Sequence, residues 1–409
     1  MMADNGSKKE NIRDLDKVDA VMEKRVQKIY WLSKRGHETL DDKIKDANKD
    51  SDNINNSQTN EDVDVNRSAE EKPSEKESIE MKNVNNIDHV LLRPSPNTET
   101  LNKSGCLQVH QNLQVQKVNL YDCAFPHVII HHGGQLGNKL CQYISLYLLR
   151  HIYGIRVSIT QTMQESLGPY FKNISLPIQD FKCFTKNTKR IKYDRLYKNL
   201  LSKTKENMRK NVSSPNSSLL DDSYYIFHHP CPREVIANYR DLIREVLVFR
   251  DDIMQKAKRR VVKALKYLKR SLQDSTLVTV HVRRKDYTRY ILKHYNLTQL
   301  SQSYFHRAFD YYRRRVNNPV FVVVSDDQPW CRKVLEGKDV VVAGSKKDPI
   351  VDLAILSLGN HHIISYGTFS FMGATLGHGK VVHPYSDNKL YDHYNCVDPK
   401  IFVPISRDD

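Results

Sequence analysis

The sequence predicts an α/β protein with two Rossmann-like domains that follow a charged, disordered N-terminal segment. Between about residues 118 and 385, short apolar runs rich in strand-forming residues alternate with helical patterns. The strands are apolar throughout, which is typical of parallel sheets that helices cover on both faces. We therefore expect a disordered or stem-like segment over residues 1–117, a first domain over 118–250 and a second over 251–409.

Composition restricts the class of protein. The chain has 409 residues, a length that allows two domains with a substantial core. Its formal net charge of +16 is compatible with a nucleic acid, an anionic membrane or a phosphorylated small molecule as partner. No run of about eighteen apolar residues occurs, so no transmembrane helix is predicted. The charged N-terminus also lacks an apolar core of signal-peptide length.

The seven cysteines are scattered along the chain and form no CxxC pair. This spacing argues against a zinc ribbon or a thioredoxin-like motif. The odd count allows a few disulfides in an oxidising compartment but does not require them.

The segment up to about residue 105 is rich in Asp, Glu, Lys, Asn and Ser, with almost no aromatic or β-branched periodicity. So little apolar surface cannot offset the entropy that is lost on ordering, and we therefore expect disorder. One apolar stripe over residues 16–32 has helical spacing. It predicts a marginal solvated helix, with a short membrane-surface or partner helix as the alternative.

In the first domain, a strand over residues 127–130 runs into a glycine-containing loop and then a helix over 140–153. The loop holds Gly134 and Gly137 and ends at Asn138. Such a loop lets backbone amides and a helix N-terminus approach an anionic or sugar ligand. Its spacing is neither a Walker A motif nor GxGxxG, and a tight turn that packs the helix on the strand is the alternative.

The remainder of the first domain is less informative. Strands are expected over residues 156–160 and 224–227. The basic stretch over 181–215 is either a loop with short helices above an acceptor cleft or a solvated linker. Helices are expected over 240–248 and 251–272. The second of these is amphipathic with its charges in water, and a nucleic-acid-binding face is the minority alternative.

The second domain is built around a central strand that begins at Leu277 and leads to two arginines. After it, strands and helices alternate as in βαβ units. The further strands are expected over residues 320–324, 340–343, 362–365 and 381–382, and the helices over 303–316, 330–335, 350–358 and 367–376.

Polar residues follow three of these strands, and in a parallel sheet such strand ends meet at one edge, where ligands bind. Arg283 or Arg284 presents a planar fork suited to phosphate, although neighbouring strand residues point to opposite faces. Asp326 or Asp327 is suited to accept hydrogen bonds from a ribose or base. Hydroxyls at a helix N-terminus are suited to donate to phosphate. Together these groups predict a nucleotide-diphosphate site; singly, the arginines fit an ion-paired sheet edge equally well, and Thr368 fits an ordinary helix cap.

Four stretches resemble the α-1,2-fucosyltransferases, the galactoside 2-α-L-fucosyltransferase family. His281 to Tyr287 looks like the HxRRxDY motif of that family. Gly134 to Lys139, followed by Gln142 and Tyr143, is similar to a motif in which a glycine-rich turn carries an Asn. The other two similarities lie in Ser325–Asp327 with Trp330 and Cys331, and in Asp352–Ala354 with Ser365, Thr368, Phe369, Ser370, Gly373 and Ala374. Their order and spacing agree from about residue 120 to 385.

The resemblance implies a GT-B-like fold. It implies a glycosyltransferase that moves L-fucose from GDP-fucose to the 2-hydroxyl of a terminal galactose on a glycan, with inversion. GDP-fucose is then a co-substrate. No cofactor and no metal are expected, and Asp326 and Asp327 form no DxD motif. The family also implies a Golgi location and membrane association, although the sequence shows no anchor.

The resemblance also assigns roles to residues of this chain. Arg283 neutralises the β-phosphate of the leaving GDP, which stabilises charge in the transition state. Asn138 faces the fucose or the acceptor from the other domain. Asp286 orients the arginines or contacts the nucleotide, and no general base is identified. The residues expected to bind the donor are His281, Arg283, Arg284, Ser325, Asp326, Asp327, Ser365, Thr368 and Ser370.

The chain departs from the family pattern at three positions. Lys285 stands where Gly is usual, Gln135 where Arg is common and Phe371 where Trp is frequent. Lys285 adds a charge and a side chain beside the arginines. Possible N-glycosylation sites, which fit a secretory lumen, are Asn173, Asn211, Asn216 and Asn296.

Three other interpretations stay open. One is a fucosyltransferase of other linkage, such as a protein O-fucosyltransferase, because related folds share an arginine-based GDP site. A second is a basic anion-binding or nucleic-acid-binding module, although the sequence has no RNA-binding motif. The third is an inactive relative that has kept the fold.

Overall fold

The computed structural model describes residues 126–130, 132–179, 188–210, 219–345 and 347–407. All of them belong to one compact unit. The segment over 1–117, with the helix expected over residues 16–32, lies outside the described residues. We refer to residues 126–250 as the first half and to residues 251–407 as the second half.

The first half contains a four-stranded parallel sheet. Its strands, in the spatial order β2-β1-β4-β3, are β1 (Val128–Ile130), β2 (Val157–Ser158), β3 (Lys189–Ile191) and β4 (Tyr224–Ile226). All three pairings are parallel. The helices of this half are α3 (Leu136–Tyr153), α4 (Gln161–Leu167), α5 (Tyr193–Arg209), α6 (Arg233–Asn238) and α7 (Arg240–Val246).

The central helix of the first half is α3. It is buried over most of its circumference, because its own apolar residues are distributed around the helix axis. It begins at Leu136, earlier than expected, so Gly137 and Asn138 lie in its first turn and not in the loop. It ends at Gly154, whose φ of 64° is left-handed and whose N–H donates to the carbonyl of Arg150. A disulfide between Cys141 and Cys231 links α3 to the loop that precedes α6. Two neighbouring segments of this half are thus joined covalently.

The second half contains a six-stranded parallel sheet in the order β10-β9-β8-β5-β6-β7. Its strands are β5 (Thr276–Val282), β6 (Pro319–Ser325), β7 (Val340–Val342), β8 (His361–Ile363), β9 (Val381–Tyr385) and β10 (Phe402–Ser406). Its helices are α8 (Asp251–Tyr267), α9 (Lys285–Tyr295), α10 (Gln302–Arg313), α11 (Gln328–Val334), α12 (Pro349–Ser357), α13 (Gly367–Leu376) and the 3₁₀ helix η3 (Lys389–Tyr394).

The buried strand β5 lies inside this sheet, between β6 and β8. The chain moves outward through β6 and β7 and then returns to the other side of β5 at β8. In open α/β sheets such a reversal of strand order opens a crevice beyond the carboxyl ends of the strands. The fold therefore places a candidate site just after Val282 and Ile363.

The structure corrects three expectations. The described part of the basic stretch over 181–215 contains β3 and a 17-residue helix, α5, so that part is not a loop or linker. The arginines do not extend β5, because the strand ends at Val282 and α9 begins at Lys285. Side-chain alternation along a strand therefore does not decide where Arg283 and Arg284 point. Strand β10 was not expected at all.

The expected amphipathic helix of the second half is α8, which ends at Tyr267, earlier than expected. One face of it packs against α12, and the basic side chains on the opposite face are exposed. Its buried residues are Ile253, Ala257, Val261, Ala264 and Leu265.

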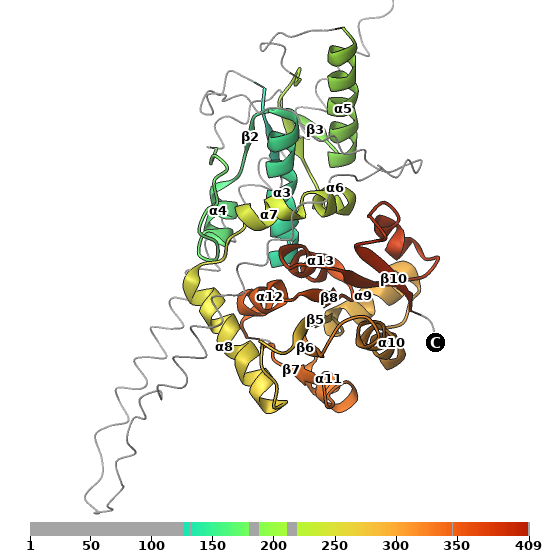
Figure 1. The fold of residues 1–409 in the computed structure, drawn as a ribbon. Helices are drawn as coiled ribbons and strands as arrows, with labels where there is room; N and C mark the ends of the chain where they lie inside the picture. Colours follow the sequence, from blue (N-terminus) through green and yellow to red (C-terminus); the bar gives the residue numbers. More distant parts are fainter. Residues whose placement is uncertain (1–125, 131, 180–187, 211–218, 346, 408–409) are drawn as a thin grey trace, which may run out of the picture. The chain divides into compact units, whose positions relative to one another are not determined.

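The carboxyl end of α13 is held by a buried arginine of the first half. Arg240 donates from Nη2 to the carbonyls of Ala374 and Gly377, at 2.8 and 2.9 Å, and from Nη1 to Gly379 at 3.0 Å. The last carbonyls of a helix have no partner within the helix, so these bonds satisfy them. Burial lowers the pKa of Arg240 to about 10, which leaves it charged at pH 7. Helix α13 also contacts α3 and α7 of the first half (Figure 1).

Replacing Arg240 by Ala leaves the carbonyls of Ala374 and Gly379 without this donor, whereas Gly377 keeps a hydrogen bond from Nη1 of Arg244 at 3.1 Å. An orphaned buried polar group costs about 1–3 kcal/mol, so we expect the free energy of unfolding in urea to fall by about 2 kcal/mol or more. The control is Arg315→Ala, which removes an exposed arginine that lies on Tyr311. It should change the free energy by no more than about 0.5 kcal/mol. Equal stability of Arg240→Ala and wild type would contradict the structural role of this arginine.

A buried carboxyl at the start of α12 connects this helix to α8. The Oδ1 atom of Asp352 accepts from the N–H of Ser345 at 2.7 Å and from Nη1 of Arg260 at 3.3 Å. Burial raises the pKa of Asp352 to about 7, although the Ser345 hydrogen bond and the charge of Arg260 act in the opposite direction.

This carboxyl makes stability depend on pH. Its pKa is near 4 in an unfolded chain, so the folded chain holds more protons, and stability falls as the pH rises from about 4 to about 7. Asp352→Asn removes this titration and keeps an oxygen that accepts both hydrogen bonds. We expect the fall in unfolding free energy across that window to be smaller in the variant, by an amount on the order of a few kcal/mol. The control is Asp348→Asn, which changes the more exposed carboxylate on Arg260; identical pH profiles for Asp352→Asn and wild type would refute the expectation.

Candidate functional site

The carboxyl ends of β5, β6 and β8 form one connected edge of the second sheet. The N–H of Arg283, which follows β5, donates to Oγ of Ser365, which follows β8, at 3.0 Å. The N–H of Arg284 donates to Oδ1 of Asp326, which follows β6, at 2.9 Å. The strand ends that the sequence singled out therefore lie together, at the reversal of strand order.

The side chain of Arg284 is occupied by contacts within the protein. Its guanidinium carbon lies 3.8 Å from the centre of the Trp330 ring, and its Nε lies 3.4 Å from Oδ2 of Asp327. Its Nη1 donates to the carbonyl of Leu300 at 3.4 Å. Burial raises the pKa of the neighbouring Asp326, and the hydrogen bond from the Arg284 N–H acts against this rise. Arg284, Asp326 and Asp327 thus form an internally paired wall of the crevice.

Arg283 keeps part of its hydrogen-bonding capacity. Its Nη2 donates to Oδ2 of Asp286 at 2.7 Å, and its guanidinium carbon lies 5.0 Å from the centre of the Tyr287 ring. Its Nε is buried and has no hydrogen-bond partner in the part of the chain that the structure describes. The guanidinium also approaches the N-terminus of α13, since a Cβ at Gly367 would lie 3.7 Å from Nη1. Arg283 is therefore the arginine of the pair that is available to an anion.

A chain of buried hydrogen bonds supports this edge. Nδ1 of His281 lies 2.9 Å from Oγ of Ser370, and the N–H of Ser365 donates to the same oxygen at 3.0 Å. On β6, Oγ of Ser325 accepts from the N–H of Asp327 at 2.9 Å. Burial, with the charge of Arg283, lowers the pKa of His281 to about 3, so the imidazole is neutral at pH 7.

Direct contact of four of the expected donor-binding side chains with the donor stays a prediction. His281, Ser325, Ser365 and Ser370 are buried, and their polar atoms hydrogen-bond to one another or to the backbone. They hold the loops that follow β5, β6 and β8, so we interpret them as positioning residues.

Two helix N-termini meet beside Arg283. Oγ1 of Thr368 in α13 donates to Oδ1 of Asn138 in α3 at 2.7 Å. Thr368 is not the helix cap, because Tyr366 occupies that position. Gly134 has a φ of 78°, which a side chain rarely tolerates. Both helix ends carry partial positive charge, so the junction is suited to an anion.

Aromatic rings on different elements line the same edge, and sequence reasoning missed their arrangement. Tyr287 of α9 stacks on Tyr366 with 5.3 Å between ring centres, and Phe369 lies 5.1 Å from the His281 ring. Burial raises the pKa of Tyr287 to about 12, so its hydroxyl stays protonated at pH 7. Tyr287 is the last residue of the motif over residues 281–287, but the sequence assigned it no role. No feature of the sequence near Tyr366 indicated that it lies at this edge.

A family model described as Glycosyl transferase family 11 matches residues 107–395, more than half of the chain. The chain belongs to glycosyl transferase family 11.

Named members with similar sequences are fucosyltransferases. "Galactoside alpha-(1,2)-fucosyltransferase 1" of Oryctolagus cuniculus is 29% identical over 259 residues, which are 62% of this chain and 65% of that protein. "Galactoside 2-alpha-L-fucosyltransferase Sec1" of Mus musculus is 31% identical over 254 residues, 61% of this chain and 64% of that protein. The chain thus spans less than two thirds of the length of these curated relatives.

Comparison with solved structures matches the chain to the one titled "Crystal structure of Se-Met fucosyltransferase NodZ from Bradyrhizobium". The TM-score is 0.41 at 11% sequence identity, over 64% of this chain and 96% of that chain.

Two features are absent from the described residues of this family 11 chain. No group of three or more His, Cys, Asp or Glu side chains is arranged there to hold a metal ion. No described helix is both long and apolar enough to cross a membrane.

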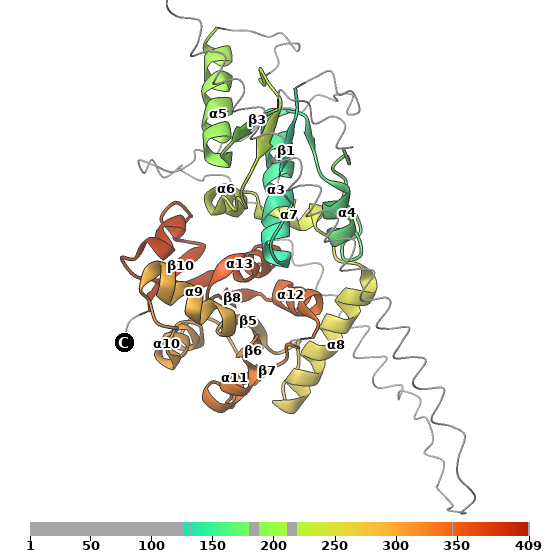
Figure 2. The ribbon, with the colours of Figure 1, turned by 180° about the vertical axis from the view of Figure 1, so that it is seen from behind.

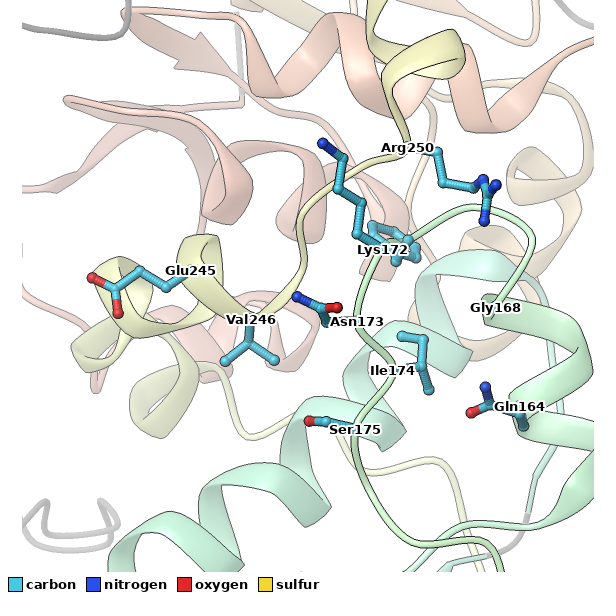
Figure 3. A pocket seen from close by; sticks show the side chains of 10 residues that line it. Gln164, Gly168, Lys172, Asn173, Ile174, Ser175, Glu245, Val246 and Arg250 are labelled. Carbon is cyan, nitrogen blue, oxygen red and sulfur yellow. The ribbon is translucent and has the colours of Figure 1, made fainter.

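A cavity of about 480 Å³ lies between α4, the loop after it and the segment that joins α7 to α8 (Figure 3). Its charged residues are Lys172, Glu245 and Arg250, and Lys172 pairs with Asp251 at 2.6 Å. None of the residues expected to bind the donor lines it. The groups at the strand ends are therefore not part of this cavity.

Two of the four possible N-glycosylation sites fall among the described residues. Asn173 is exposed and lines the cavity of Figure 3. Asn296 is exposed at the end of α9 with a φ of 52°. Asn211 and Asn216 lie outside the described residues.

Gly137 has no room for a side chain, because a Cβ there would lie 2.4 Å from the backbone nitrogen of Phe369. Since that neighbour is backbone, Gly137→Ala has to push α3 and α13 apart. We expect the free energy of unfolding to fall by about 1–3 kcal/mol. The control Gly337→Ala, with no atom within 4 Å of the new Cβ, should stay within about 0.5 kcal/mol of wild type. A Gly137→Ala protein as stable as the control would argue against close contact of the two helix ends.

Proposed function

We propose that the chain is a galactoside 2-α-L-fucosyltransferase. It transfers L-fucose from GDP-fucose to the 2-hydroxyl of a terminal galactose on a glycan and inverts the anomeric centre. Membership of glycosyl transferase family 11 and the names of the similar relatives support this activity. The observation that carries the proposal is Arg283, a partly exposed cation at the reversal of strand order with a nitrogen that lacks a partner among the described residues.

In this proposal the two parallel sheets are the two Rossmann-like halves of a GT-B-like fold. The second half, over residues 251–409, binds the donor, and the first half, over 118–250, faces the acceptor. The contact between α3 and α13 supports this assignment, because it brings Asn138 of the first half to the crevice of the second.

The reaction is a displacement at C1 of fucose. The oxygen of the acceptor 2-hydroxyl attacks C1, and the bond between C1 and the β-phosphate oxygen breaks. The electron pair stays on that oxygen, so negative charge grows on the leaving GDP. Arg283 and the N-terminus of α13 are the fixed positive groups that meet this charge. The acceptor hydroxyl loses its proton to a base that we do not assign.

Other residues have supporting roles in this mechanism. The ion pair with Asp286 orients Arg283. The wall made by Arg284, Asp326 and Asp327 borders the nucleoside. Asn138 with Thr368 faces the fucose or the acceptor. His281, Ser325, Ser365 and Ser370 hold the loops that carry these groups.

The departure from the family pattern at Lys285 is compatible with activity. Lys285 is exposed at the first position of α9, so its charge is not buried by the change from Gly. This favours an active enzyme over an inactive relative.

The proposal extends to the setting of the enzyme. It places the protein in the Golgi with membrane association, as a glycoprotein modified at Asn173 and Asn296. The enzyme requires no metal or other cofactor in this proposal.

The test is release of GDP from GDP-fucose with a lactose-type acceptor. We expect Arg283→Ala to lower kcat by about 100-fold to 1,000-fold, the usual cost of losing a group that stabilises transition-state charge. Circular dichroism should show an intact fold. The control is Arg289→Ala, which removes an exposed arginine of α9, the helix that follows Arg283, and should keep the wild-type rate.

Three results would change the proposal. Equal rates for Arg283→Ala and wild type would remove Arg283 from the mechanism. Linkage analysis of the product would expose a fucosyltransferase of other linkage. Wild type that is inactive with several acceptors, and that binds nucleic acid with steep salt dependence, would favour the anion-binding module.

A further inference from the structure

A second arginine, Arg233, is buried without a counterion among the residues that the structure describes. Arg233 is the first residue of α6 and is 8% exposed. Its guanidinium carbon lies 4.6 Å from the centre of the Tyr394 ring and 5.4 Å from that of Phe371. No carboxylate or carbonyl among the described residues accepts a hydrogen bond from it. Aromatic faces repay only about 0.5–2 kcal/mol of the cost of burying a charge.

Another arginine of the first half that packs on the second half differs in this respect. Arg240 is also buried, but its guanidinium donates to three carbonyls. The carboxyl of Glu234, which follows Arg233 in sequence, forms no ion pair with it among the described residues. Burial raises the pKa of Glu234, and the charge of Arg233 is the weakest influence on that group. Arg233 therefore presents a full set of N–H donors and a charge for which the described residues offer no anion.

Local structure directs Arg233 towards α13. The disulfide from Cys231 to Cys141 ties the preceding loop to α3, the helix that carries Asn138. Pro232 then occupies the cap position of α6. Phe371, under the guanidinium, lies one turn after the N-terminus of α13. In the view of Figure 2, α6 lies above α13 and α9 lies below it.

The charges of the two arginines, which belong to different halves, both act on the pKa of one tyrosine. Arg283 lies on the face of the Tyr287 ring. Burial raises the pKa of Tyr287 to about 12, and the charges of Arg233 and Arg283 both act against that rise. Two histidines that interact with the charge of Arg233 are neutral at pH 7. Burial lowers the pKa of His383 to about 4 and that of His393 to about 3.

We propose that Arg233 is a second donor-binding residue, which contacts a phosphate oxygen of the sugar nucleotide together with Arg283. This inference rests on the proposed function. A diphosphate carries negative charge on both phosphates, and a guanidinium pairs well with each of them. The sugar nucleotide then supplies the anion that Arg233 lacks. It also connects the two halves, because one arginine comes from each.

The experiment compares the affinity of the full-length protein for GDP and for guanosine, which lacks phosphate. Arg233→Met keeps an apolar stem on Tyr394 and removes the charge, and Arg233→Lys restores a charge. We expect Arg233→Met to bind GDP about 10-fold to 100-fold more weakly, as for loss of a charged hydrogen bond, with unchanged guanosine affinity. Arg233→Lys should recover part of the GDP affinity. Arg315→Ala, an exposed arginine on a tyrosine ring, should match wild type for both ligands.

Several results would overturn the role of Arg233. GDP and guanosine affinities that fall by the same factor in Arg233→Met would show a structural role only. Unchanged GDP affinity with a higher KM for an acidic acceptor would assign Arg233 to the acceptor. Suppose that wild type binds GDP and transfers fucose, and that Arg233→Met leaves the ratio of GDP affinity to guanosine affinity unchanged. Then only this inference fails. If wild type neither binds GDP nor transfers fucose, the proposed function itself fails.

Discussion

The hydrogen bonds from Arg240 to the carboxyl end of α13 are the contact on which the crevice depends. Helix α13 belongs to the second sheet in sequence, yet the first half holds it at both ends. Arg240 satisfies its last carbonyls, and Asn138 accepts from Thr368 at its first turn. A helix fixed at both ends cannot slide or tilt without breaking buried polar contacts, which are costly to leave unmade. The position of the positive N-terminus beside Arg283 follows from this constraint.

The two adjacent arginines that follow β5 make different contacts and have different roles. Arg284 lies on Trp330 and is paired with Asp327, so it contributes to the wall. Arg283 has one ion pair, with an exposed Asp286, and keeps a nitrogen without a partner among the described residues. The neutral His281 behind them adds no competing charge. In the proposed function, Arg283, Arg233 and the helix ends are the positive groups that meet the charge of the leaving diphosphate.

Much of this arrangement followed from the sequence, because strand periodicity and polar strand ends are local signals. Alternating apolar runs predicted parallel sheets, and both sheets are parallel. What the sequence missed depends on contacts between distant segments. Nothing near Arg233 indicated that it would lie on Tyr394, some 160 positions later, and nothing near Tyr366 indicated its stacking on Tyr287. The buried hydroxyls were expected to face a ligand, since strand-end polarity does not distinguish a ligand contact from an internal hydrogen bond.

The link between Cys141 and Cys231 has a practical consequence for making the protein. It spans 90 positions of sequence and connects the helix of Asn138 to the loop before Arg233. A cross-link of this length removes many conformations from the unfolded chain. A preparation kept under reductant, or made in a bacterial cytosol, lacks that restraint. In such a preparation no covalent bond joins α3 to the loop before α6 at these two cysteines. The redox history of a sample is therefore a variable that any comparison of donor affinity has to hold constant.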